Sequence, residues 1–231
     1  MKHLIETANP SGLAITEYDR LILNSTTNDV IVKGGGYVDL GLPSSLKWAK
    51  YNVGAESETD YGDYFMWGST KANTADECTW ANAPFNNGSS SYNSTYFSEV
   101  KDTVCPNGIL AKEYDAAAQI MGGDWRMPTK AEIQELINNT TKEWITNFNG
   151  SGVNGRKFTS KTDTSKYVFI PAAGFRANDS VNYVGSDGDV WGSSLDISIP
   201  DYAWGLTLNS SVCCMGYSYR CYGRSVRGVM D

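Results

Sequence analysis

Histidine is almost absent from this sequence: the single one, His3, lies near the N-terminal end of 231 residues. Catalytic dyads and triads that use imidazole as the base need a histidine inside the fold, and so do zinc sites built on histidine. The first residues of a domain are usually poorly ordered, so His3 is a poor candidate for either role. The composition therefore argues against both classes of chemistry.

Positive charge is also scarce. The chain has 19 Lys and Arg against 26 Asp and Glu, a formal net charge of -7 and a sequence pI near 4.8. Binding to a phosphate backbone requires clustered Lys and Arg, so nucleic acid is not an expected partner. Aromatic residues are plentiful by contrast, at 12%. Tyr and Trp among Ser, Asn and Gly are typical of recognition surfaces, and also of β-rich folds with many turns.

Long apolar runs are missing. Nothing near the N-terminus resembles the core of a signal peptide, and no later stretch predicts a membrane span or membrane insertion. We therefore expect synthesis without a leader, unless one was trimmed, with export on a phage particle as another route. The five cysteines are unevenly spaced with no CxxC pair, which favours neither a disulfide framework nor a zinc ribbon.

The order of patterns predicts an α+β fold. Residues 1–33 predict two or three short strands, around 13–15, 21–23 and 30–32. Glycines 34–36 predict a hinge, so we place an N-terminal appendage at 1–35 and a main domain at 36–231. Residues 69–100 predict one long excursion packed through Trp80, Phe85, Tyr92 and Phe97. Strands are expected again at 157–159, 168–171, 190–191, 203–208 and 225–229.

Two helices are expected in the middle of the chain. The first covers residues 112–121, which are rich in Ala, and Gly122-Gly123 ends it. The second begins at Lys130, because Thr129 and Glu132 have the spacing of a capping box. Its core-facing side would carry Ile133, Leu136 and Ile137. Helices between two β regions indicate a mostly antiparallel sheet with two helices packed on it.

Five ordered motifs resemble a known family. They are YVDLGLPSSLKWA at 37–49, GDWRMPT at 123–129, IPAAGF at 170–175, WGSS at 191–194 and RSVRGV at 224–229. Together they resemble the Fibrobacter succinogenes-type major paralogous domain of Bacteroidetes, which is similar to the C-type-lectin fold. The resemblance covers residues 36–231 and implies a C-type-lectin-like main domain.

Within that family, residues 192–224 are similar to the variable region of proteins diversified by a retroelement. In such systems an error-prone reverse transcriptase randomises template adenines, often in Asn codons. The resemblance therefore implies a fixed scaffold that displays varied side chains and binds a ligand, without enzymatic activity and without a cofactor.

A codon argument tests this expectation independently. Randomising the first two bases of AAC never yields Met, Trp, Lys, Glu or Gln, and residues 195–224 contain no Lys, Glu or Gln. Trp204 and Met215 fall outside the allowed set, so they are framework or derive from another codon. The predicted ligand-binding residues are Asp196, Ser198, Asp201, Tyr202, Trp204, Thr207, Ser211, Cys213, Met215, Tyr217, Tyr219 and Tyr222.

Metal and redox chemistry are weaker alternatives for this region. Vicinal Cys213 and Cys214, with Cys221, have poor geometry for one tetrahedral ion, and no histidine can complete the set. Residues 187–189 (DGD) resemble part of a calcium loop, but a turn is the better interpretation because the remaining oxygen ligands are missing. Cys78 and Cys105 are expected to be buried thiols, with one disulfide as the alternative. No metal is predicted.

Side-chain orientation follows from the alternation expected for residues 203–208. Leu206 and Leu208 share one side of the strand, with Thr207 on the other. Trp204 shares the parity of the leucines, yet a bulge could turn it outward, and both orientations stay open. Residues 209–222 fit either a polar surface loop or a tyrosine-rich binding segment. The framework residues Trp48, Trp67, Trp125 and Trp191 are expected in the core, and Arg220, Arg224 and Arg227 to be structural.

The favoured hypothesis is a phage tail receptor-binding protein whose ligand is a protein or glycan on another cell or particle. Residues 1–35 would attach the domain to the virion or hold a homotrimer. The first alternative is a bacterial surface adhesin, or fimbrial-tip-like lectin, whose leader was removed. The second is an enzyme related to the formylglycine-generating proteins, which share this fold class and depend on reactive cysteines.

Overall fold

The computed structural model describes residues 21–23, 30–32 and 35–231. Within this part, the chain is α+β, as expected, with several sheets that are mostly antiparallel. The strands expected at 21–23 and 30–32 are present as β1 and β2. Most of the predicted N-terminal appendage, including the strand expected at 13–15, lies outside the described residues.

Three α-helices are present in the described residues, where two were expected. They are α2 (Ser94–Val104), α3 (Ala116–Met121) and α4 (Lys130–Asn139), with 3-10 turns η2 (Pro106–Gly108), η3 (Lys112–Tyr114) and η4 (Phe148–Gly150). The capping box of α4 is confirmed: the Thr129 hydroxyl accepts the Glu132 N–H, and the Glu132 carboxylate accepts the Thr129 N–H. The first predicted helix is shorter than expected, because η3 replaces its first turn.

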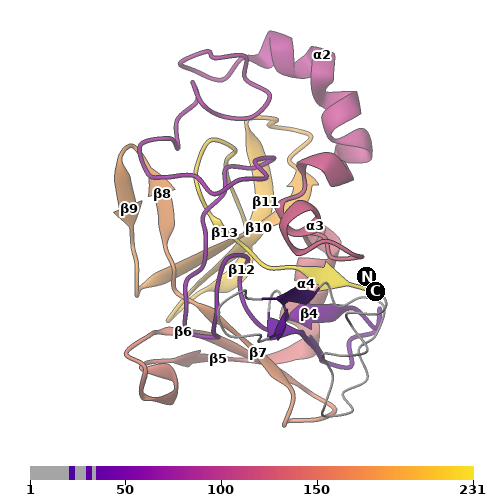
Figure 1. Ribbon diagram of the computed structural model, residues 1–231, viewed down its shortest axis with the longest axis vertical. Coiled ribbons are helices and arrows are strands. Elements are labelled where there is room, and N and C mark those ends of the chain that lie inside the picture. The colour runs from indigo at the N-terminus through magenta and orange to yellow at the C-terminus, as the bar shows by residue number, and fades with distance from the viewer. Residues whose placement is uncertain (1–20, 24–29, 33–34) are drawn as a thin grey trace.

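Helix α2 corrects the prediction of a single irregular excursion over 69–100. The Asn93 side chain caps it by accepting the Tyr96 N–H, and Phe97 and Val104 are its buried residues. Ser and Thr dilute the apolar pattern, so the helical spacing of Phe97, Val100 and Val104 is weak in the sequence. Figure 1 shows α2 at the top of the molecule, beside the long loop that precedes it.

The strands form five sheets among the described residues. Their orders are β1-β2, β12-β11-β10-β13, β14-β4-β3, β5-β6-β7 and β8-β9. The strands are β1 (Leu21–Leu23), β2 (Val30–Val32), β3 (Tyr37–Asp39), β4 (Lys47–Ala49), β5 (Thr140–Ile145), β6 (Gly155–Ser160), β7 (Tyr167–Pro171), β8 (Phe175–Ala177), β9 (Ser180–Asn182), β10 (Asp187–Leu195), β11 (Tyr202–Asn209), β12 (Cys213–Tyr219), β13 (Ser225–Val226) and β14 (Val229–Met230). Every pairing is antiparallel except that of β10 with β13.

The β10–β13 sheet lies at the centre of the molecule, above β5, β6 and β7 in Figure 1. Apolar residues are buried on both of its sides. Leu206 and Leu208 pack on one side with Ile133 and Leu136 of α4. Trp191 packs on the other with the helices α2 and α3. The predicted framework tryptophans Trp48, Trp67, Trp125 and Trp191 are all buried, which confirms their place in the core.

A turn was expected at residues 187–189 (DGD), and this prediction is wrong, because these residues are the start of β10. Asp189 is buried and its carboxylate contacts the guanidinium of Arg224 at 3.0 Å. Asp187 accepts a hydrogen bond from the Asn209 amide of the neighbouring strand. Because these carboxylates are bound by partners within the sheet, their spacing in sequence reflects strand pairing.

The three C-terminal arginines are structural, as predicted. Arg227 is fully buried and donates to the carbonyls of Ala49 and Phe169 and to the Asn52 side chain, each at 2.9 Å. These bonds join the chain after β13 to β4 and β7. Together with the Arg224–Asp189 pair, they fix the segment that follows the β11–β12 hairpin.

Candidate ligand-binding face

The β11–β12 hairpin brings together side chains from the predicted variable region. The two strands pair without interruption from Tyr202 opposite Tyr219 to Leu208 opposite Cys213. In an antiparallel pair, directly opposed residues share one side of the sheet. Trp204, Tyr217, Leu206 and Met215 therefore lie on the same side as α4, which we call the helix side.

Helix α4 covers only part of the helix side. Leu206 and Leu208, with 1% and 0% exposure, pack under Ile133 and Leu136. The first residue of the helix, Lys130, places its Nζ atom 3.3 Å from the centroid of the Trp204 ring. The helix begins at this point, so the strand residues beyond it, toward Tyr202, are not covered by it.

An aromatic cluster occupies this open half. Tyr202 and Tyr219 stack with ring centroids 4.4 Å apart, and Tyr217 lies edge-on to both Tyr202 at 5.2 Å and Trp204 at 5.5 Å. Tyr222 meets Tyr219 at 5.5 Å. We define the aromatic cluster as Tyr202, Trp204, Tyr217, Tyr219 and Tyr222. Tyr217 is 53% exposed and the other four are half-buried, so the cluster is an accessible surface.

The rings continue beyond the residues that the sequence singled out. Trp80 lies edge-on to Tyr219 at 6.1 Å, and Phe175 of β8 stacks on Tyr222 at 5.4 Å. The sequence predicts that Trp80 packs somewhere and places Phe175 in a family motif, but it assigns neither to the binding site. Both residues lie far from the hairpin in the sequence, so short sequence patterns cannot predict that they contact it.

Arg220 lies buried beside the aromatic cluster, at the end of β12. It is fully buried, its Nε atom donates to the Pro200 carbonyl at 2.8 Å, and its guanidinium lies 3.9 Å from the Phe97 ring centroid. Trp80 and Tyr92 lie farther from it, at 5.8 and 5.5 Å. This cation therefore joins α2 and the loop before it to the end of β12, although burial lowers its pKa.

Two hydroxyl groups of the cluster have a raised pKa. Hydrogen bonding with Tyr219 and burial raise the pKa of Tyr202, and burial raises that of Tyr222. Neutral phenols donate and accept hydrogen bonds while their rings offer apolar contact area. The surface thus suits binding more than proton transfer near neutral pH.

Three other predicted residues lie in the loop before β11, next to the cluster. Asp196 is buried and its carboxylate accepts the N–H groups of Ser198 and Ile199, which shapes the turn. Ser198 is exposed and Asp201 is half-buried. The structure therefore places Ser198 and Asp201 at the margin of the aromatic cluster, with Asp196 as a support.

The remaining four predicted residues lie elsewhere. The Thr207 hydroxyl donates to Asp189 at 2.9 Å on the opposite side of the sheet. Cys213 and Met215 are half-buried against the core under α4. Ser211 is exposed in the turn between the two strands, at the far end of the hairpin. The structure does not bring these four residues into the aromatic cluster.

The structure decides the orientation of Trp204, which the sequence left open. This residue shares the helix side with Leu206 and is half-buried, with Lys130 above its ring. Residues 209–222 are not a loose loop, because β12 occupies half of them and Asn209 ends β11.

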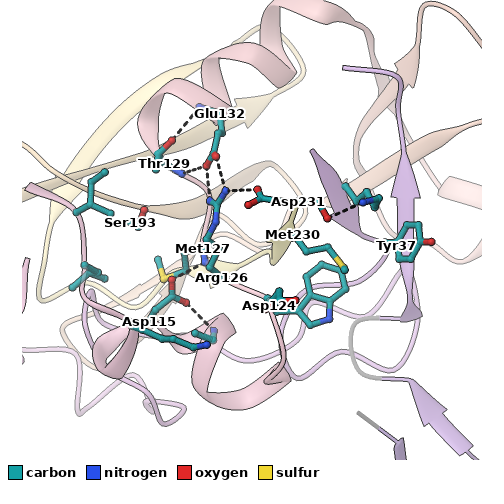
Figure 2. Close-up of a pocket in the computed structure, with 16 residues that line it drawn as sticks. Tyr37, Asp115, Asp124, Arg126, Met127, Thr129, Glu132, Ser193, Met230 and Asp231 are labelled. Carbon is teal, nitrogen blue, oxygen red and sulfur yellow. Dashed lines mark hydrogen bonds and ion pairs between the residues drawn. The ribbon is translucent and has the colours of Figure 1, made fainter. Parts of the chain in front are cut away.

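A cavity of about 800 Å³ lies away from this face, between α3, the start of α4 and the strands β4 and β14. Figure 2 shows Arg126 between the carboxylates of Glu132 and Asp231. Arg126 donates twice to Glu132, at 2.7 and 2.8 Å, and once to Asp231 at 3.1 Å. Buried Asp115 accepts the N–H groups of Ala118 and Met127. These polar groups satisfy one another, and none of the predicted site residues lines the cavity.

Comparisons with known proteins found no match. No protein-family model, no curated protein and no solved structure corresponds to this chain. The aromatic cluster and the sequence motifs are the features of this chain that bear on its function.

The three buried thiols are hard to ionise. Burial raises the pKa of Cys78 and Cys105 to about 11 and that of Cys221 to about 12. All five cysteines are free, so the disulfide considered for Cys78 and Cys105 does not form. In the described part of the chain, no group of His, Cys, Asp and Glu could hold a metal ion, and no helix could cross a membrane.

Proposed function

We propose that this chain is a non-enzymatic recognition protein with a C-type-lectin-like domain, and that the β11–β12 hairpin displays its retroelement-diversified ligand-binding residues. The observation that carries the proposal is the aromatic cluster on the open half of the helix side. Five aromatic side chains from the predicted variable region meet there, on a scaffold whose framework tryptophans are buried.

The chemistry of the cluster supports recognition. Tyr and Trp are enriched in the energetically important centres of protein interfaces because they supply large contact areas at little cost in side-chain entropy. Aromatic faces also stack on sugar rings, so the ligand is a protein or glycan of another cell or particle. Ile197 and Ile199, in the loop before β11, are exposed and add apolar area to this part of the surface.

Three observations support binding without catalysis. The pKa values of the buried thiols are raised, whereas a nucleophilic cysteine needs a lowered pKa. Arg126 of the cavity is paired with the carboxylates of Glu132 and Asp231. The hairpin carries no Lys, Glu or His that could act as a general base.

The resemblance to retroelement-diversified proteins supports a place at a phage tail, where the domain would contact the host receptor. A bacterial surface adhesin is the alternative with the same binding chemistry. Residues 1–35 would then serve attachment to the particle or to the cell, or assembly of a homotrimer.

Sequencing the same gene from sibling isolates tests diversification. We expect substitutions concentrated within residues 192–224, at Asn-type codons, with a reverse-transcriptase gene nearby. Trp191 and Arg227 should be invariant, since both are buried framework. Differences spread evenly over the chain would contradict the retroelement hypothesis.

Binding to a panel of intact bacterial cells tests the site itself. Replacing Tyr217 or Tyr202 by Ala should weaken binding to the recognised strain by at least about tenfold, as expected for central aromatic contacts. Ser211→Ala, at the far end of the hairpin, is the matched control and should bind as the unmodified protein does. If Ser211→Ala and Tyr217→Ala behave alike, the aromatic cluster is not the binding site.

A further inference from the structure

Strand β12 is the outer strand of the central sheet, since the order is β12-β11-β10-β13. Its hydrogen bonds to β11 fix which backbone groups point inward. The Arg220 N–H donates to the Asp201 carbonyl, and the Asn209 N–H donates to the Val212 carbonyl. In an antiparallel ladder these bonds recur at every second residue. The backbone groups of Cys214, Gly216 and Ser218 therefore face β11.

The alternate residues point their backbone groups away from the sheet. They are Cys213, Met215, Tyr217 and Tyr219, the same residues whose side chains lie on the helix side. Within the part of the chain that the structure describes, the N–H and carbonyl groups of Cys213, Met215 and Tyr217 have no hydrogen-bond partner. The Tyr219 carbonyl accepts the Tyr222 N–H. Met215 and Tyr217 thus form the centre of an open backbone edge.

Natural edge strands are usually protected by charge, proline, a bulge or short length. Strand β12 has none of these: it is seven residues long, pairs with β11 without a register shift, and carries no charged residue or proline. Strand β5, another outer strand, carries Lys142 and Glu143, and β7 ends at Pro171. The difference indicates that the edge of β12 is available for pairing.

Resting on the proposed function, we infer that the ligand of this protein is a polypeptide that adds an extended segment to β12 as a fifth strand of the sheet. The alternating N–H and carbonyl groups of Met215 and Tyr217 match another extended backbone, which a glycan cannot supply. The segment would lie along the aromatic cluster and in contact with exposed Tyr217.

The side chains of β12 define the chemistry of that segment. Residues opposite Met215 and Tyr217 would lie on the helix side, where apolar or aromatic side chains fit beside the tyrosine rings. Residues opposite Gly216 would lie on the other side, where Cys214, Gly216 and Ser218 are small and leave room for branched side chains. The segment therefore alternates aromatic or apolar residues with β-branched ones.

Charge sets a preference at one end. Arg156 donates a hydrogen bond to the carbonyl of Asn209, at the turn that precedes Cys213, and Lys142 donates to the carbonyl of Ile137 at the end of α4. Both cations also oppose the rise that burial causes in the pKa of Cys213. Among the described residues, neither cation forms an ion pair with a carboxylate. An acidic residue of the added segment would complement them, so we place an Asp or Glu opposite the Cys213 end.

A proline at residue 215 tests the inference on the full chain. Met215→Pro removes an outward N–H and leaves the ladder to β11 intact, whereas Met215→Ala shortens the side chain and keeps the N–H. In binding to the recognised bacterial strain, Met215→Pro should lose about tenfold or more and Met215→Ala less than about threefold. Equal binding by the two variants would overturn strand addition, and circular dichroism would verify that both are folded.

A second measurement leaves the protein unchanged. Linear peptides selected from a displayed random library on the full chain should compete with cell binding. The amides of such a peptide form two alternating sets, and N-methylation of one set should abolish competition while N-methylation of the other set should not. Equal effects of methylating either set, or no competing linear peptide, would overturn the inference. A dimer of the unmodified protein in light scattering that Met215→Pro dissociates would assign the edge to a second copy and also overturn it.

These outcomes separate the inference from the proposed function. If Tyr217→Ala abolishes cell binding and Met215→Pro does not, the aromatic site stands and strand addition fails. If Tyr217→Ala and Ser211→Ala bind equally well, the proposed function itself fails.

Discussion

The two halves of the helix side of the β11–β12 hairpin share strands, register and orientation, yet they differ in burial. Leu206 and Leu208 are closed under α4, whereas Trp204 and Tyr217 remain accessible. The alternation of the strand decides which side a residue takes. The position of a helix that comes much earlier in the chain decides whether that residue belongs to the core or to a binding surface.

The start of α4 therefore defines the border of the site. Thr129 and Glu132 fix the first helical turn through the capping box, and Lys130 then lies over Trp204. A helix beginning one turn earlier would cover part of the aromatic cluster. A local capping signal thus limits a surface built from a distant hairpin.

The sharpest test of this contrast uses two residues of one strand. Leu206→Ala should lower the free energy of unfolding by about 2–5 kcal/mol, because it opens a cavity beneath α4. Trp204→Ala should cost about 1 kcal/mol, since the ring is half-exposed and already in contact with solvent. Guanidinium unfolding measures both, and equal losses would show that the two halves are not different.

Removing the N-cap of α4 should loosen the first turn of the helix, which limits the aromatic cluster. Thr129→Ala should reduce stability by about 1 kcal/mol, the usual loss for an N-cap. The first turn would fray and Lys130 would leave the Trp204 ring, which should change the tryptophan fluorescence. Asn93→Ala removes the cap of α2 and is the matched control, with a similar loss of stability. The fluorescence change caused by Thr129→Ala should disappear when Trp204 is also replaced by Ala, and Asn93→Ala should cause no such Trp204-dependent change.

The same helix start makes stability depend on pH. Burial tends to raise the pKa of Glu132, but hydrogen bonds from Arg126 and from the Thr129 N–H prevail and lower it. A carboxyl group whose pKa is lowered in the folded state stabilises the fold at pH values above its ordinary pKa. This stabilisation is lost as the pH falls through the folded-state pKa.

In practice, unmodified protein should exceed Glu132→Gln in stability at pH 7. The gap should shrink as the pH falls below about 4.3, the ordinary pKa of Glu, and close once the pH has passed below the lowered folded-state pKa of Glu132. Thermal unfolding across pH measures it. Glu99→Gln on the exposed side of α2 is the control, and an unchanged gap at low pH would contradict the role assigned to Glu132.

The smallest expected effect on stability belongs to the open half. Tyr217→Ala should change the free energy of unfolding by no more than about 0.5 kcal/mol, because the residue is exposed and surface substitutions usually lie in this range. Guanidinium unfolding would check this for the same variant that is expected to lose binding. A loss of several kcal/mol would place Tyr217 in the framework.

The sequence predicts the local features of the fold well. The capping box at Thr129, the buried tryptophans and the structural arginines all follow from short patterns and are present. Helix α2 escaped prediction because Ser and Thr dilute its apolar spacing, and residues 187–189 form a strand because Arg224 and Asn209 bind their carboxylates.

The candidate site is predicted only in part, for a related reason. The sequence includes Tyr202, Trp204 and Tyr217 among the candidate binding residues, and the structure brings these three together on one side of the hairpin. Sequence patterns cannot show that α4 closes over Met215 or that Trp80 reaches Tyr219, because both contacts join segments far apart in sequence. Long-range packing therefore selects the accessible members from a locally predicted set.

The pairing of β10 with β13 joins the two ends of the predicted variable region. Val190 lies opposite Ser225 and Trp191 opposite Val226, so residues 192 and 224 begin and end at adjacent positions of buried framework. Between them the chain completes β10 and forms β11 and β12, whose residues Leu206, Leu208 and Arg220 are buried. Exchange of this segment as one unit should therefore succeed only when the incoming sequence keeps these buried residues, whereas its exposed positions are free to vary.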